Sequence, residues 1–399
     1  DRINAERTME QTLIDIRRAL SLFAPNGGYE EGVIYWGLTM EFFTYYMKAL
    51  LTSINEDFGY IDVPGMRNTN KFLFAMNGSV SIFNYHDAGR ARTYIPPQSM
   101  FLADYFGKYE EAQPRINKIL NNGEADVMDI CLYEKKFSAE TKRKSELNTY
   151  MPVAETVTMR TGWNKDDIYV GLHCDDPYGG PGHDHMDAGQ FVIDALGENF
   201  FMDLGPDSYN LPKYHDTYHF RAEGHNTVVI NPSMDYGQKF GGKASIEKYC
   251  FSDNGGYAIG NMTNAYDEAV SFRRGIMLNA SDKTITLRDE INLKEESEIL
   301  WSAHTCAEIE TYGGGKKARL KLNGKTLYAE IKNSDNAVFN TMAAKPLPTS
   351  PMVEGQDEND GIQKLVIALK KCKKIDLTVV FSTEEEKSGS AKPLNEWET

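Results

Sequence analysis

Cysteine is scarce in this sequence, and its distribution provides no covalent framework. The 399 residues include five cysteines, an odd number, and no Cys-x-x-Cys pair occurs. The sequence therefore indicates neither a disulfide network nor a thiolate zinc site. Long apolar runs are also missing, since none reaches the ~18 residues that a membrane-spanning helix requires. The opening residues, DRINAERTMEQ, are polar and lack the hydrophobic region of a signal peptide.

Positive charge is in short supply as well. The 43 Lys and Arg residues face 58 Asp and Glu residues, which gives a net charge of −15. Such a surface repels nucleic acid and anionic membranes, so neither is an expected partner. An anionic substrate would need local cations to overcome this field. Hydrophobic residues make up 41% of the chain, which is enough for sizeable cores, and the length favours two domains.

The first third of the chain has the periodicity of helices. In RTMEQTLIDIRRALSLF, apolar residues recur at steps of three and four. The next run, EGVIYWGLTMEFFTYYMKALLTSI, is apolar on nearly every face, which is typical of an inner helix of a helical barrel.

From Val153 onward the dominant period is two, as in antiparallel strands separated by Gly, Asn and Asp turns. Helices followed by strands predict an α+β protein with segregated domains. We expect a helical domain at 1–135, a charged connector at 136–152 and a large antiparallel β-sandwich at 153–399. The expected strands include ETVTMRTGW, DIYVGLHC, GQFVIDAL, NTVVIN, TITLRDEI, ARLKLNG, TLYAEIK and DLTVVFS.

Two of the eight histidines lie one residue apart, in GHDHMDAGQFVIDALGENFFMDLG. In an extended segment, alternate residues share a face, so His183 and His185 are expected to point the same way. The turn LGEN should return the chain alongside and bring Asp203 near them. His225, at the start of the strand in RAEGHNTVVIN, is a third candidate. Imidazole and carboxylate ligands in this pattern favour a zinc site.

Other interpretations of these residues remain open at this point. A histidine beside a strand is more often a hydrogen-bonded residue than a ligand, and His86, His173 and His304 have no partner by spacing. A cupin-type metal oxygenase also places His-x-His before a strand. It requires a glutamate three or four residues later, where this chain has Ala188, Gly189 and Gln190.

Several segments together resemble one family. GHDHMDAGQFVIDALGENFFMDLGPDSYN, FRAEGHNTVVIN and FRRGIMLNASDKTITLRDEI resemble the β-domain of the heparinase II/III-like polysaccharide lyases, and NGGYEEGVIYW resembles a segment of their helical toroid. The resemblance implies an N-terminal incomplete (α/α) toroid followed by a large antiparallel β-sandwich domain. It also implies elimination across the C4–O4 bond of a uronic acid, in a glycosaminoglycan such as heparan sulfate or in alginate, without a redox cofactor.

The resemblance also assigns residues. It implies that Tyr35 acts as base or acid, that His183 shares the proton transfer and that Tyr209 is a second active-site tyrosine. Family members also carry a substrate-binding Asn or His upstream of that tyrosine. In this sequence the segment before Tyr35 is too short to include that position. The implied zinc ligands are His185, Asp203 and His225.

β-Elimination needs a neutralised C6 carboxylate, a base for the C5 proton and an acid for the departing O4. Tyrosine, with an ordinary pKa near 10, is a poor base unless cations lower it. We expect Arg221 to supply positive charge at the substrate, and Tyr29 and Trp36 to stack on sugar faces or to pack in the core. Because nothing indicates an open coordination position, we expect a structural zinc.

The sequence thus predicts a periplasmic or secreted lyase that acts on an acidic polysaccharide. Two alternatives are a non-catalytic carbohydrate-binding or assembly module with a structural zinc, and the cupin-type oxygenase. The sequence leaves the identity of the polymer and the oligomeric state open.

Overall fold

The computed structural model describes residues 2–137, 146–177, 183–385, 387, 389 and 391–397. The chain divides into two compact units. Residues 77–93 fall inside the helical domain expected from the sequence but cluster with unit 2, and the expected connector 136–152 lies partly outside the described residues. Unit 1 comprises Asp1–Met76, Tyr94–Glu146 and Met151–Ala154, and unit 2 comprises Asn77–Thr93, Leu147–Tyr150 and Glu155–Thr399.

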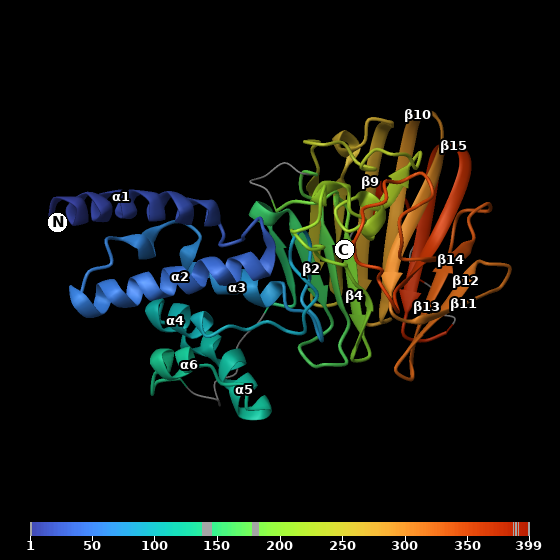
Figure 1. Ribbon diagram of the computed structural model, residues 1–399. Helices are drawn as coiled ribbons and strands as arrows, with labels where there is room; N and C mark the ends of the chain where they lie inside the picture. Colours follow the sequence, from blue (N-terminus) through green and yellow to red (C-terminus); the bar gives the residue numbers. More distant parts are fainter. Residues whose placement is uncertain are drawn as a thin grey trace. The chain divides into compact units, whose positions relative to one another are not determined.

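Unit 1 is helical (Figure 1). Its longest helix buries Val33, Trp36 and Met40 along one face, at steps of three and four residues. Leu38 and Phe42 on the same helix are exposed, so the all-round burial expected for this segment is not found. The six helices of the described residues do not by themselves establish the expected toroid. They are α1 (Arg2–Leu20), α2 (Gly32–Ser53), α3 (Thr69–Ala75), α4 (Gln98–Tyr105), α5 (Gln113–Asn122) and α6 (Val127–Leu132).

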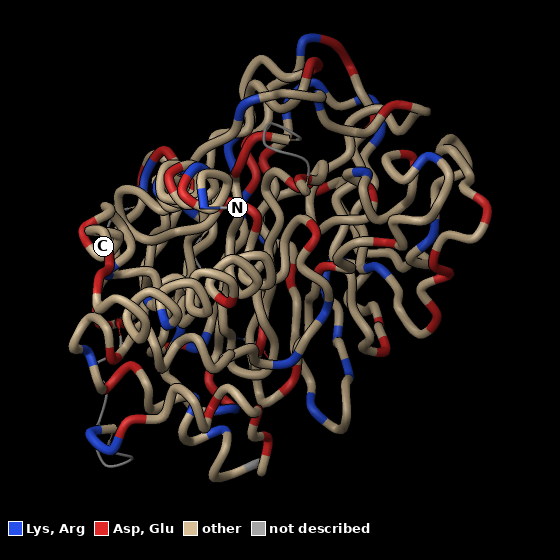
Figure 2. Tube along the Cα trace, turned by 60° about the vertical axis from the view of Figure 1, so that its left-hand side comes forward, with Lys and Arg blue, Asp and Glu red and all other residues tan. Residues whose placement is uncertain are grey.

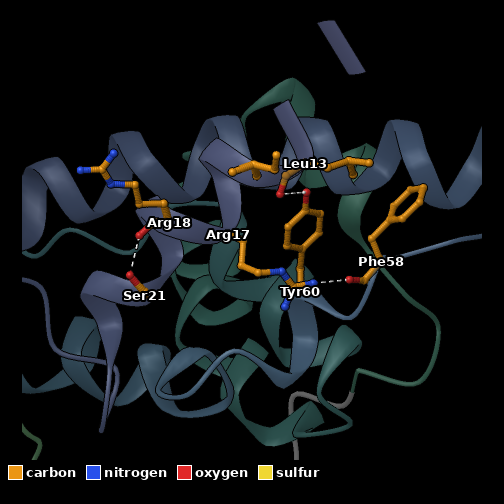
Figure 3. A pocket seen from close by; sticks show the side chains of 7 residues that line it. Leu13, Arg17, Arg18, Ser21, Phe58 and Tyr60 are labelled. Atoms are coloured by element: carbon orange, nitrogen blue, oxygen red, sulfur yellow. Dashed lines mark hydrogen bonds between the residues drawn. The ribbon is translucent and has the colours of Figure 1, made fainter. Parts of the chain in front are cut away.

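A surface pocket of about 560 Å³ lies beside α1 in unit 1 (Figure 3). Arg17 donates a hydrogen bond to the carbonyl of Phe58 (2.5 Å), and the Tyr60 hydroxyl donates to the carbonyl of Leu13 (3.1 Å). These bonds hold the segment around Tyr60 against the helix. Of the pocket's lining residues that the structure describes, none belongs to the predicted site. Among the described helices, none combines the length and apolar character needed to cross a membrane.

Unit 2 contains two antiparallel sheets. The smaller sheet has the order β1-β2-β3-β4-β5. The larger sheet has the order β11-β12-β13-β15-β10-β9-β8-β7, with β14 paired to β15 and β6 paired to β10. The strands are β1 (Asn148–Met151), β2 (Thr156–Arg160), β3 (Tyr169–His173), β4 (Phe191–Ala195), β5 (Glu198–Phe201), β6 (Val228–Ile230), β7 (Ser245–Ser252), β8 (Gly255–Asn261), β9 (Ala269–Asn279), β10 (Thr284–Thr305), β11 (Glu308–Tyr312), β12 (Lys317–Leu322), β13 (Lys325–Ile331), β14 (Phe339–Ala343) and β15 (Gln363–Ser382).

The two sheets share one hydrophobic core. Leu172 and Phe191 of the smaller sheet belong to the same buried cluster as Trp301 and Phe381 of the larger sheet. The long strands β9, β10 and β15 lie side by side, and β10 pairs with both neighbours (Figure 1). The C-terminal part of the chain is therefore a β-rich domain of two sheets around a common core.

Acidic and basic residues are interspersed along the chain (Figure 2). The net charge of −15 is therefore spread over the molecule. The charges that act at any one site are set by the few residues around it, because exposed charges are screened beyond about 8 Å at physiological salt.

Candidate functional site

The histidine-containing segment leads into the hairpin of β4 and β5. The chain turns at Leu196 and Gly197, which both have positive φ (56° and 83°), so the expected hairpin is present. Residues 183–190 themselves are not a strand. The backbone N–H of Met186 donates to the carbonyl of Phe220 (3.0 Å), which fixes the segment beside His185. His185 is fully buried, whereas His183 is half-buried, so the two side chains have different surroundings.

The predicted metal ligands lie together in unit 2. The ring of His185 lies 5.3 Å from the ring of His225, centroid to centroid. Asp203 follows β5, and its Oδ2 lies 2.6 Å from Nδ1 of His225. Its other oxygen accepts a hydrogen bond from the backbone N–H of Gly205 (2.7 Å). In this arrangement Asp203 orients His225 and does not complete a three-ligand group with the two imidazoles.

The electrostatic surroundings of the two histidines differ. Burial lowers the pKa of His185, and a hydrogen bond to Asp87 opposes this without reversing it. Burial also acts to lower the pKa of His225, but the charge of Asp203 outweighs it and raises the pKa above its usual value. His185 is therefore neutral near pH 7, while His225 has an increased affinity for a proton or another cation.

Two nitrogen atoms at this site are without hydrogen-bond partners in the part of the chain that the structure describes. They are Nδ1 of His185 and Nε2 of His225, and both are buried. A buried polar atom without a partner is costly, and a metal ion would satisfy both nitrogens at once. The donor atoms of the two histidines thus fit zinc, whereas both Asp203 oxygens are already engaged.

Asp87 is the central residue that sequence reasoning missed. Its Oδ1 lies 2.8 Å from Nε2 of His185 and accepts a hydrogen bond from the hydroxyl of Tyr214 (2.6 Å). Burial acts to raise the pKa of Asp87, but hydrogen bonds from His185, Tyr214 and Tyr209 lower it below its usual range. The Asp87 N–H also donates to the carbonyl of His183 (3.2 Å). Asp87 therefore links four residues of the site.

Tyr209 and Arg221, two further residues of the predicted site, differ in their exposure to solvent. Tyr209 is 55% exposed, and its ring lies 5.2 Å from that of Tyr214. Arg221, expected to bind substrate, is only 3% exposed. Its guanidinium donates to Glu223 and to the carbonyls of Ser233, Met234 and Asp235. The expectation that Arg221 binds substrate is therefore wrong. Its guanidinium donates its hydrogen bonds to the loop after β6 and has no donor that points to solvent.

The predicted residues of unit 1 have varied environments. Tyr35 is half-buried in α2. Trp36 is fully buried, and its Nε1 donates to Oγ1 of Thr69 (2.7 Å), so it is a core residue and not a platform for sugar. Tyr29 is half-buried, and its ring stacks on Phe23 at 4.9 Å.

Arg274 of β9, in the larger sheet, donates hydrogen bonds to the backbone of the segments that contain His185 and His225. Its guanidinium makes a bidentate pair with Asp289 (2.7 and 2.8 Å). The remaining donor, Nη1, bonds the carbonyls of Gly189 (2.7 Å) and Asn226 (3.0 Å). Gly189 lies four residues after His185, and Asn226 directly follows His225. One fully buried cation therefore fixes the backbone next to both histidines.

Several solved structures that resemble the chain are heparinases. A crystal structure of heparinase III matches with a TM-score of 0.70 and 14% identity, covering 95% of this chain and 58% of that one. A heparan sulfate lyase HepC mutant from Pedobacter heparinus matches with a TM-score of 0.68 and 14% identity, covering 93% and 55%. A second heparinase III gives 0.66 and 12%, covering 92% and 53%. At this identity the similarity establishes the fold, and the chain spans little more than half the length of these proteins.

At the level of sequence, no curated protein matches the chain. The family model "Heparinase II/III-like, C-terminal" matches residues 154–378, which is more than half of the chain and includes most strands of both sheets. This match favours the heparinase II/III-like family over a cupin-type metal oxygenase. The chain belongs to the heparinase II/III-like family.

Proposed function

We propose that the chain is the part of a polysaccharide lyase that cleaves an acidic, uronate-containing polymer by β-elimination. One observation carries the proposal. Buried His185 and Asp87 form a network with half-buried Tyr214, beside half-buried His183 and exposed Tyr209, in a heparinase II/III-like domain. Similar solved structures are described as heparinase III and as a heparan sulfate lyase, which favours a glycosaminoglycan over alginate as the substrate.

The residues of the network suit a division of roles. His185 is neutral, buried and bonded on one side to Asp87, so it is a positioning residue. His183 is linked to the same network through its carbonyl and is less buried, so it is the candidate for moving the C5 proton. Tyr209 is exposed and reaches Asp87, which suits a donor to the departing O4.

Zinc is part of the proposal, held by His185 and His225, with Asp203 beside Nδ1 of His225. The support is that Nδ1 of His185 and Nε2 of His225 are buried without a hydrogen-bond partner among the described residues. Zinc, when bound, would supply a fixed positive charge that holds the segments on which His183 and Tyr209 lie. Asp203 would then be a ligand or the orienting partner of His225.

The helices of unit 1 are proposed to be part of an incomplete (α/α) toroid that contributes Tyr35 as base or acid. The support is the resemblance of NGGYEEGVIYW to the family's toroid segment and the helical character of the unit. A polymer outside the cell requires a periplasmic or secreted enzyme, so this location belongs to the same proposal.

The test is the ultraviolet absorbance of the unsaturated uronate formed by elimination, with heparan sulfate, heparin and alginate as substrates. The chain spans little more than half the length of these similar proteins, so the assay includes any longer natural form of it as well as the chain itself. We expect Tyr35→Phe and His183→Gln to lose roughly 100-fold or more in kcat. Tyr45→Phe on the same helix and the exposed His215→Gln are the matched controls. No absorbance increase with any uronate polymer would refute the proposal.

A non-catalytic carbohydrate-binding module is the second candidate. Its support is that Arg221 and Trp36 are committed to internal contacts, which leaves the predicted substrate residues few in number. Polymer binding in a pull-down without any product, for this chain and the natural protein, would favour this function over the lyase.

A further inference from the structure

A second group of potential metal ligands lies in unit 2, outside the set that the family resemblance assigns. His86, His173 and Asp175 each offer a ligand atom, and these atoms all lie within 4.8 Å of one another. In the part of the chain that the structure describes, this is the one group of three His, Cys, Asp or Glu residues that meets this distance. Sequence spacing gave no sign of it, because His86 and His173 are far apart in the chain.

The backbone presents these residues from two fixed segments. His173 is the last residue of β3, and Asp175 follows two residues later. His86 lies in the segment Asn77–Thr93, which joins unit 2 without being part of either sheet. Its φ of 53° is in the left-handed region, where a non-glycine residue is uncommon. The side chain of His86 is 1% exposed, and that of His173 is fully buried.

Each imidazole is oriented through its Nδ1 atom. Nδ1 of His86 lies 3.2 Å from Oδ2 of Asp187, and Nδ1 of His173 lies 3.0 Å from the hydroxyl of Thr156. Histidines that bind metals are held in this way, with the second nitrogen bonded to a carboxylate or another oxygen. Nδ1 of His86 also lies within hydrogen-bond distance of the backbone N–H of His185 (3.3 Å), so the lone pair of Nε2 is available to a metal when Nδ1 carries a proton toward Asp187. That Nε2 atom is buried and has no hydrogen-bond partner among the described residues.

The local charge favours a cation at this place. Asp184 is 3% exposed and Asp187 is 1% exposed, and Oδ1 of Asp184 lies 3.7 Å from Nε2 of His86. With Asp175, three carboxylates surround two imidazoles. Because the carboxylates outnumber the imidazoles, the local charge has an excess of negative sign that attracts a cation. A divalent cation would balance this excess and also satisfy Nε2 of His86.

We propose that His86, His173 and Asp175 bind a second metal ion, of the zinc class, with Asp184 as the nearest fourth ligand. Two imidazoles with one or two carboxylates are the ligands of zinc and similar transition metals, whereas calcium and magnesium require mostly oxygen. The ion would fasten the segment 77–93 to the end of β3. Since Asp87 follows His86 directly, the same ion would position the carboxylate that bonds His185 and Tyr214.

The direct test is a crystal structure of the unaltered chain grown with zinc, with anomalous difference maps recorded on both sides of the zinc absorption edge. We expect a peak bonded to His86, His173 and Asp175, whether or not another lies at His185 and His225. A peak only at His185 and His225, or no peak with the three side chains ordered as described, overturns the proposal. This measurement needs no variant and no lyase activity, so it can fail or succeed independently of the proposed function.

Metal content in solution provides a second test. Zinc is removed with a chelator and restored, and the bound equivalents are counted by mass spectrometry for the folded chain. We expect His173→Gln and Asp175→Asn each to bind one equivalent fewer than the parent, and Asp176→Asn, the neighbouring control, to bind the same number. Full zinc content in both ligand variants would overturn the proposal. If either variant does not fold, His225→Gln is loaded with Co²⁺ instead. Visible bands of tetrahedral cobalt are then expected, and their absence counts against the site.

Discussion

Lys364 is a buried cation whose removal should stabilise unit 2 at neutral pH. It lies in β15, is fully buried, and its Nζ has no hydrogen-bond partner among the described residues. The ammonium group lies 5.1 Å from the ring centroid of Tyr218, which offsets only part of the cost of burial. Burial lowers the pKa of Lys364 from 10.5 to about 8, although the charge of Glu223 opposes the shift.

This pKa shift sets the magnitude and the pH dependence. Below pH 8 the lysine is charged in both the folded and the unfolded chain, so the full cost of burial is present. A shift of about 2.5 pKa units corresponds to about 3 kcal/mol at pH 7. Between pH 8 and 10.5 the unfolded chain binds more protons than the folded chain. The destabilisation caused by Lys364 therefore becomes smaller as the pH rises. At pH 10 about 1 kcal/mol of the cost is left.

We therefore expect Lys364→Met to raise the free energy of unfolding by about 2–3 kcal/mol at pH 7 and by about 1 kcal/mol at pH 10. Methionine has a similar length, and Glu223 keeps its bonds to Arg221 and to the backbone of Leu347. The measurement is urea unfolding of variant and parent at both pH values. Lys370→Met, an exposed position on the same strand, is the control and should show no such trend. The reasoning would be refuted if Lys364→Met were no more stable than the parent at pH 7 and if the difference in their free energies of unfolding did not become smaller at pH 10.

Three further substitutions test the internal contacts of unit 2. Arg274→Met should destabilise the unit by about 3–5 kcal/mol in urea unfolding, since Asp289 stays buried without its partner, and Arg274→Met/Asp289→Leu should recover much of the loss. Asp194→Ala should cost about 2–4 kcal/mol in the same assay, since the N–H groups of Val80 and Ser81 lose their acceptor; an unchanged midpoint would contradict this. Asp87→Asn should leave the melting temperature within a few degrees but lower lyase activity about 10- to 100-fold, and equal activity would show that its charge is not needed.

The strands of the β-domain were largely readable from the sequence. All eight segments with a period of two lie in strands, from β2 to β15. The length of β10 was not predictable, because its middle, NLKEESE, is charged and breaks the alternation. Pairing with β15 stops after Asn292 and resumes at Ser297 with a register shift, and Leu293 pairs with Ala269 of β9 in between. Neighbouring strands therefore hold a segment whose local pattern does not indicate a strand. The segment 77–93 was assigned to the helical part because its attachment to unit 2 depends on contacts distant in sequence.

The site was only partly predictable, for a similar reason. The hairpin that carries Asp203 toward His225 follows from local turn chemistry. Asp87 and Tyr214 could not be found, since Asp87 meets His185 across 98 positions of the chain and no spacing rule covers such a contact. Arg221 was misjudged because a charged residue in a loop suggests a surface ligand, whereas its partners are backbone carbonyls that a sequence does not reveal.

The pair His183 and His185 illustrates how the fold assigns different tasks to similar residues. Because residues 183–190 are not a strand, the two side chains do not share one face in the simple alternation of a sheet. The bond from Met186 to Phe220 holds the chain at His185 inside the domain, where Asp87 engages its Nε2. His183 lies at the edge of the same network and keeps partial access to solvent. A proton carrier must meet both solvent and substrate, so under the proposed function His183, and not His185, is the histidine expected to transfer the proton.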